Sequence, residues 1–134
     1  MSMTTPGLAA LIQGEPWRYP GDTDQPAFEN GWGNLVGSIK LAFRMRTPGV
    51  MDIYGVAQGG TPGSTIITVP EDYWPNREAT SNQVLGLVTG DRVLSDVIVG
   101  TDGAVSVVSY PDDPDIVAIF AQVFLDLPEI EPSP

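Results

Sequence analysis

The chain has 134 residues, enough for one domain with a single modest core, and 42% of them are hydrophobic against 17% charged. Seventeen acidic against six basic residues give a net charge of −11, which disfavours binding to nucleic acid and to anionic membrane surfaces. Because the sequence contains no Cys and no His, disulfides, thiolate nucleophiles, Cys/His zinc sites and imidazole bases are excluded.

Residues 1–30 lack the periodicity of a strand and are predicted to form an irregular arm. A short apolar run comes first, followed by a stretch rich in Pro, Gly and Asp that carries large aromatic residues. This arm either packs as a loop across the protein's own sheet or docks onto a neighbouring subunit or particle. The candidate anchoring residues are Leu8, Leu11, Ile12, Trp17 and Tyr19. The run is too short for a signal peptide, and no stretch of the chain is long enough to span a membrane.

From residue 35 onward the sequence has the pattern of β-structure. Apolar residues at 41, 43 and 45 alternate with basic residues at 40, 44 and 46, which predicts a strand with one buried face. A turn at 47–49 leads to a return strand over 50–57, and a β-branched run covers 64–69. Fifteen Gly and thirteen Pro fit such short strands joined by tight turns.

The second half of the chain continues this pattern. Residues 71–83 are predicted to be irregular, and strands are expected at 84–88, 92–99 and 104–110. The last two are joined by Asp102-Gly103, a strong hairpin signal. We therefore predict a β-domain over residues 31–126, followed by an acidic, Pro-rich tail at 127–134.

Residues 116–125 form a ribbon that is apolar on both faces of an extended strand. Only Gln122 interrupts it. A strand exposed to water on one side should alternate apolar and polar residues, so both faces of this one are expected to be covered, either within the domain or by another copy. A helix is the alternative, but β-branched and aromatic residues dominate the segment. The candidate interface residues are Val117, Ile119, Phe120, Val123 and Phe124.

The carboxylates do not form a pattern typical of catalysis or of metal binding. Asp112, Asp113 and Asp115 share a turn with two prolines, and Asp91 and Asp96 flank a strand. A glycosidase needs two carboxylates held in opposition, and a calcium loop needs the EF-hand spacing, which is absent. There is no phosphate-binding loop and no Ser-His-Asp arrangement. We expect no enzyme activity, no metal and no cofactor.

Basic and aromatic residues are the remaining candidates for binding. The basic residues of the 40–46 strand either pair with acids of a neighbouring strand or contact an anionic polymer. The aromatic rings at 32, 54, 73 and 74 either pack in the core or stack on sugar rings. The candidate surface or glycan contacts are Trp32, Arg44, Arg46, Tyr73 and Trp74.

Several short motifs occur in a fixed order between residues 30 and 125. They are Gly31-Trp32-x-Asn34, Phe43-Arg44-x-Arg46, Gly49-Val50 followed by Ile53, Gly55 and Gly59-Gly60, Thr65-Ile66, Val69-Pro70, Tyr73-x-Pro75, Asp102-Gly103-x-Val105, and a closing apolar strand with Phe120 or Phe124. In this order the chain resembles the small β-sandwich domains that end phage tail-fibre and other tail structural proteins. It departs from them at Asp72, where that family has Gly.

The resemblance implies an all-β fold, an antiparallel jelly-roll-like β-sandwich, assembled as a homotrimer. It also implies a non-enzymatic bacteriophage virion protein, a minor tail or tail-fibre-like component attached through the N-terminal arm. The alternatives are a capsid decoration or head-fibre protein, and an adhesin module that binds host-surface glycan. The expected partners are other tail or capsid proteins and host glycan, with no nucleic acid and no membrane.

Overall fold

The computed structural model describes residues 15–126. Positions 8, 11 and 12 of the predicted anchor, and the predicted tail, lie outside the described residues. Within them the fold is all-β, with one short 3-10 turn at Glu71–Tyr73. The strands are β1 (Gly33–Asn34), β2 (Ala42–Thr47), β3 (Val50–Gln58), β4 (Ile67–Thr68), β5 (Ala79–Val88), β6 (Asp91–Val99), β7 (Ala104–Ser109) and β8 (Ile116–Phe124).

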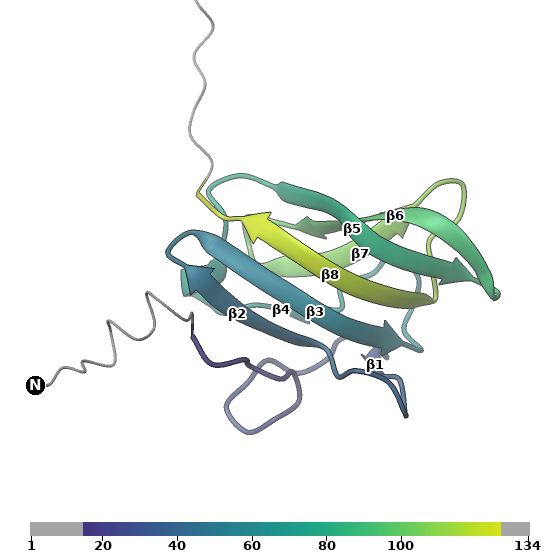
Figure 1. Cartoon of the computed structure of the whole chain (residues 1–134), viewed down its shortest axis with the longest axis horizontal. Helices are drawn as coiled ribbons and strands as arrows, with labels where there is room; N and C mark the ends of the chain where they lie inside the picture. Colours follow the sequence, from purple (N-terminus) through teal and green to yellow (C-terminus); the bar gives the residue numbers. More distant parts are fainter. Residues whose placement is uncertain (1–14, 127–134) are drawn as a thin grey trace, which may run out of the picture.

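All of these strands belong to one antiparallel sheet. Its order is β1-β3-β8-β5-β6-β7-β4, and β2 also pairs with β3. The sheet curls over itself, so that β4 and β7 lie behind β3 and β8 (Figure 1). The predicted all-β class is therefore confirmed. The jelly-roll sandwich is not, because hydrogen bonds join the strands into one curled sheet.

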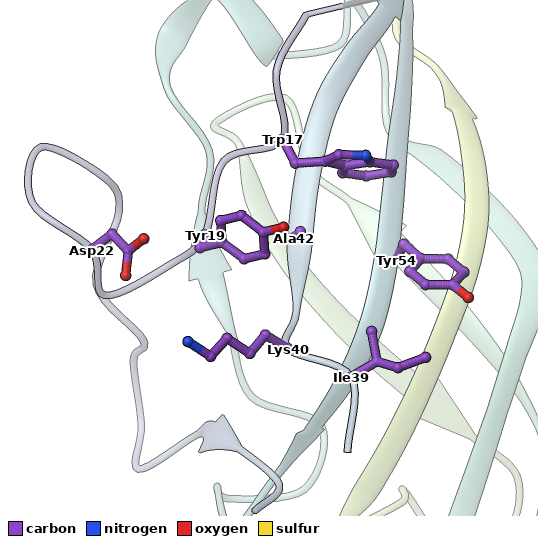
Figure 2. A pocket seen from close by; sticks show the side chains of 7 residues that line it. All are labelled: Trp17, Tyr19, Asp22, Ile39, Lys40, Ala42 and Tyr54. Carbon is purple, nitrogen blue, oxygen red and sulfur yellow. The ribbon is translucent and has the colours of Figure 1, made fainter. Parts of the chain in front are cut away.

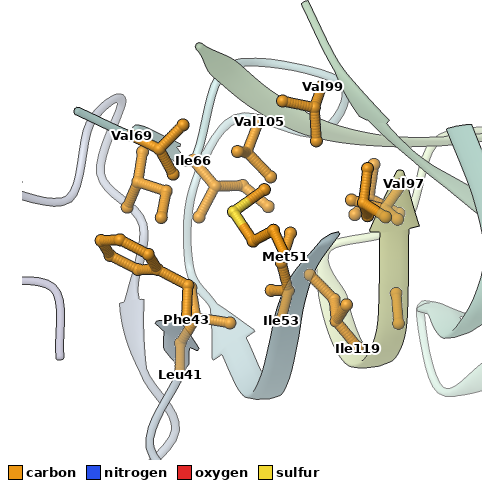
Figure 3. Close-up of a cluster of buried hydrophobic side chains, with 14 of the residues drawn as sticks. Leu41, Phe43, Met51, Ile53, Ile66, Val69, Val97, Val99, Val105 and Ile119 are labelled. Carbon is orange, nitrogen blue, oxygen red and sulfur yellow. The ribbon is translucent and has the colours of Figure 1, made fainter. Parts of the chain in front are cut away.

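The core fills the inside of this curl and follows the period-two pattern of the strands. From the β2–β3–β8 side it receives Phe43, Met51 and Ile119, and from the opposite side Val99 and Val105 (Figure 3). Each of these side chains is fully buried. Burial of such an apolar side chain contributes roughly 1.5–3 kcal/mol, which makes this the main stabilising element of the fold.

Two predicted turns are confirmed. Gly49 has φ +82° between β2 and β3, and Gly103 has φ +84° between β6 and β7. At the second turn the Gly103 N–H donates to the Gly100 carbonyl at 2.9 Å, and the Gly100 N–H donates to the Ala104 carbonyl at 2.9 Å. The strand predicted at 116–125, against the helical alternative, is also confirmed as β8, which lies between β3 and β5.

Two strand boundaries were predicted wrongly. The segment at 71–83 is not irregular throughout, because β5 begins at Ala79 and pairs with β6 through Ala79↔Val99 and Ser81↔Val97. A register shift between Ser81 and Val84 breaks the alternation there, which concealed the strand. Conversely, the β-branched run at 64–69 supplies only the two residues of β4.

Residues 15–30 pack on the protein's own sheet. The Arg18 N–H donates to the Phe43 carbonyl at 2.8 Å, the reverse bond is 3.0 Å, and the Glu15 N–H donates to the Met45 carbonyl at 2.9 Å. Further along, the Glu29 N–H donates to the Ile66 carbonyl, next to β4, at 2.8 Å. This segment therefore covers the edge of β2 that would otherwise be open to pairing.

Candidate functional site: an aromatic groove and an apolar outer face

Two of the predicted surface aromatics belong to the core. Trp32 is 4% exposed and Tyr73 is 0% exposed, so neither presents a ring face to a ligand. The Trp32 indole N–H donates to the Ser64 hydroxyl at 3.1 Å. Trp74 is 40% exposed, although its indole N–H is held by the Val69 carbonyl at 2.8 Å. Trp32 and Tyr73 are thus corrected from candidate glycan contacts to packing residues.

Tyr73 connects the core to the arm. Its ring meets Phe43 edge-on at 5.2 Å between centroids, the Arg18 guanidinium lies 5.2 Å from its centre, and its hydroxyl donates to Glu15 Oε1 at 2.6 Å. Burial raises the pKa of the Tyr73 phenol well above its ordinary value near 10, and the hydrogen bond to Glu15 raises it further, while the charge of Arg18 opposes both.

Replacing Tyr73 with Phe should make the protein less sensitive to alkaline pH. Since the folded pKa of Tyr73 is raised, its contribution to stability is complete below about pH 10 and is lost as the pH rises towards the folded pKa. One such group lowers the free energy of unfolding by up to about 1.4 kcal/mol per pH unit. At neutral pH the free energy of unfolding of the variant should be about 1 kcal/mol lower than that of the wild type, because the hydrogen bond to Glu15 is lost.

Urea unfolding at pH 8, 9, 10 and 11 measures this difference. Tyr110→Phe is the matched control, because it removes the same hydroxyl group from a residue that is 92% exposed outside the core. Identical slopes above pH 10 for wild type and Tyr73→Phe would contradict the prediction.

The two predicted arginines form an ion cluster on the outer face of the sheet. The Arg44 Nε lies 3.2 Å from Asp52 Oδ2, and the Arg46 Nε lies 3.0 Å from Asp52 Oδ1. Asp52 is only 6% exposed and stands opposite Arg44 in the β2–β3 register. Of the two interpretations left open by the sequence, local cross-strand pairing is the one observed.

Above this cluster three aromatic rings form a row. The Arg44 guanidinium lies 4.4 Å from the centre of the Trp17 ring. The Trp17 and Tyr54 ring centroids are 6.2 Å apart, and those of Tyr54 and Phe120 are 4.9 Å apart in an edge-to-face arrangement. Tyr54 is 41% exposed and Phe120 is 46% exposed. The row therefore presents aromatic surface to solvent across the arm, β3 and β8.

A hollow of about 600 Å³ opens beside this row, between the arm and the sheet. Figure 2 shows Trp17 at one end, Ile39 and Lys40 at the other, and Tyr19 and Tyr54 between them. Asp22 and Ala42 complete the lining. A second hollow of about 420 Å³ lies on the β8 side and shares Trp17 and Tyr54 with the first. We call the first hollow the aromatic groove.

The sequence did not reveal the aromatic groove. Trp17 and Tyr19 were expected to anchor the arm to a partner, yet both line a hollow on the chain's own surface. The groove exists because residues 15–18 fold back along β2, a long-range contact that no local pattern encodes. The density of aromatic residues in the arm was the available signal.

Two acidic residues of the 112–115 turn have different hydrogen-bond partners. Asp113 Oδ1 accepts the Ser109 N–H at 3.1 Å, and the Asp115 backbone pairs with Leu87 and Gly59. Within residues 15–126, no three acidic side chains converge as they would around a metal ion. In the same part of the chain no helix has the length and apolar character needed to cross a membrane.

The predicted interface residues of β8 divide between its two faces. Val117, Ile119 and Val123 are 0% exposed and belong to the core, whereas Phe120 and Phe124 are 46% and 55% exposed on the outer face. The first three are therefore corrected from interface to core residues, because they pack inside the curled sheet. Of the five predicted interface residues, Phe120 and Phe124 are the two that lie on the exposed face.

No known protein family, curated protein or solved structure matches this chain.

Proposed function

We propose that this chain is a non-enzymatic structural protein of a bacteriophage particle, a homotrimer that serves as a minor tail or tail-fibre-like component. The observation that carries the proposal is the uncovered apolar outer face of the sheet. The order of the motifs that resemble tail structural domains supports it. So does the place of those motifs in the fold, since the Trp32 ring packs against Gly60 and Tyr73 fills the core.

The outer face is continuous across four strands. Tyr54 on β3 stands opposite Phe120 on β8, Ala118 on β8 stands opposite Leu85 on β5, and Leu85 stands opposite Leu94 on β6. Leu85 and Leu94 are 41% and 94% exposed. Contiguous apolar surface of this kind on a small domain is typical of an interaction site rather than of a free surface.

A second copy of the chain suits this face. In a closed cyclic trimer every subunit buries equivalent surface, with one part of the face against a different part of its neighbour's. A jelly-roll arrangement of the curled sheet, with the core between its two sides, belongs to the same proposal. The N-terminal segment would then attach the trimer to the particle.

Light scattering coupled to size exclusion tests the trimer with the full chain. We expect three times the mass of one chain for the wild type, and a monomer for the double variant Phe120→Ser/Phe124→Ser. The matched control is Val36→Ser, since Val36 is 96% exposed outside this face. If the wild-type chain is a monomer at micromolar concentration, the proposed homotrimer is wrong.

The place in the particle needs its own experiment. Mass spectrometry of purified particles should detect the chain, and removal of residues 1–14 should lower its occupancy while leaving the packed segment at 15–30 intact. Labelling by immuno-electron microscopy separates a tail position from a capsid-decoration position. Absence from purified particles would refute a virion role.

A further inference from the structure

We propose that the aromatic groove binds a neutral oligosaccharide of two or three sugar rings. The groove shares Tyr54 with the outer apolar face, but Phe120, Phe124, Leu85 and Leu94 do not line it. The proposal does not depend on residence in a virion, so each can fail without the other.

The lining has the composition of a sugar site. Trp17, Tyr19 and Tyr54 supply aromatic surface, and both tyrosines are accessible, at 38% and 41% exposure. Aromatic rings of this kind combine an apolar face, on which the C–H face of a sugar ring packs, with a polar edge that hydrogen-bonds to hydroxyl groups. Asp22 and Lys40 add an acceptor and a donor at the rim (Figure 2).

The groove lining carries one acidic side chain, Asp22, and one basic side chain, Lys40, so it favours neither a cation nor an anion. A cation would meet Lys40 in the groove and Arg44 over the Trp17 ring, at 4.4 Å from its centre. An anion would meet Asp22 and a chain with a net charge of −11. A neutral ligand with many hydroxyl groups avoids both penalties and uses both charged side chains as hydrogen-bond partners.

The size of the groove sets the length of the ligand. Its volume of about 600 Å³ lies within the roughly 300–1,000 Å³ that small-molecule sites occupy. The second hollow begins on the other side of Trp17 and Tyr54 and contains the amides Gln83 and Gln122, so a longer saccharide has room to continue when the outer face is free. Phe120 lines that second hollow but not the aromatic groove.

Saturation-transfer NMR and calorimetry of the full chain test the proposal with defined trisaccharides. The neutral probes are maltotriose, cellotriose, xylotriose and tri-N-acetylchitotriose, and the charged comparators are trigalacturonic acid and the glucosamine trimer. We expect at least one neutral probe to bind with a dissociation constant on the order of 1 mM or tighter, and both charged comparators to bind at least tenfold more weakly.

Tyr19→Ala is the main variant, because Tyr19 lies in the arm outside the eight strands and its loss should leave the fold intact. It should weaken binding at least tenfold, and Tyr54→Ala should do the same. Tyr110→Ala is the matched control, since it removes an exposed tyrosine that does not line the groove. Lys40→Gln and Asp22→Asn should each weaken binding severalfold.

Three outcomes would overturn the inference. They are no binding of any neutral probe at 20 mM, a preference for either charged comparator, or equal binding by wild type and a folded Tyr19→Ala variant. Light scattering on the same samples shows whether the trimer persists, which separates failure of the groove from failure of the oligomer.

Discussion

Gly55→Ala is expected to yield little or no folded protein. Gly55 has φ +130°, a conformation that residues with a side chain rarely adopt. A Cβ at position 55 would also overlap the backbone of Lys40 and Leu41, with the Leu41 Cα only 2.6 Å away. These are main-chain atoms, so no rotamer change relieves the overlap.

The segment that crosses Gly55 has little freedom to move. The Val56 N–H donates to the Ile39 carbonyl at 3.0 Å, and the Leu41 N–H donates to Asn34 Oδ1 at 2.9 Å. Displacing residues 39–41 would break these bonds and disturb Leu41, which is 1% exposed in the core. We therefore expect a loss above about 4 kcal/mol, at the extreme of single substitutions.

Gly37→Ala separates the effect of the positive φ from the effect of the overlap with neighbouring main-chain atoms. Gly37 also has positive φ, +83°, but a Cβ at position 37 would have no neighbouring atom within 4 Å, so only backbone strain of about 1–2 kcal/mol applies. Soluble yield and urea unfolding followed by circular dichroism compare the two variants. If Gly55→Ala lowers the free energy of unfolding no more than Gly37→Ala does, residues 39–41 do not pass so close to Gly55.

The strands were predictable wherever one rule governed a whole segment. The alternation of residues 41–46 and the Asp102-Gly103 turn act over a few residues, and both are found as expected. The β-branched and aromatic residues of 116–125 predicted a strand rather than a helix, and β8 is that strand. The bulged start of β5 was missed because an extra residue in the ladder reverses the side-chain alternation at that point.

The candidate site was less predictable because its parts meet only in three dimensions. An aromatic ring in a sequence gives no sign of whether it fills a core, as Tyr73 does, or borders a groove, as Tyr54 does. Trp17 and Tyr54 are far apart in the sequence and meet because the arm pairs with β2 and β2 pairs with β3. The ion pairs of Asp52 could be predicted from the sequence, because the register of the β2–β3 hairpin alone brings residues of opposite charge to neighbouring positions.

Ile119→Ala and Phe120→Ala should give opposite results although the residues are adjacent in β8. The Ile119 side chain is 0% exposed in the core, so its truncation leaves a cavity and should cost about 2–5 kcal/mol of unfolding free energy. Phe120 is 46% exposed and meets the edge of Tyr54, so its truncation should cost the folded subunit about 1 kcal/mol.

The association of subunits should be weakened more by Phe120→Ala than by Ile119→Ala. Loss of Phe120 removes apolar area from the proposed interface and should shift the trimer towards monomer on dilution, whereas loss of Ile119 leaves that surface unchanged. Because unfolding of a trimer depends on protein concentration, urea titrations at several concentrations separate the two effects. The opposite result, a greater loss of stability for Phe120→Ala than for Ile119→Ala in the dilute monomer, would mean that β8 turns its other face to the core. That requires a shift of one residue in the pairing of β8, which contradicts the register in which Tyr54 stands opposite Phe120.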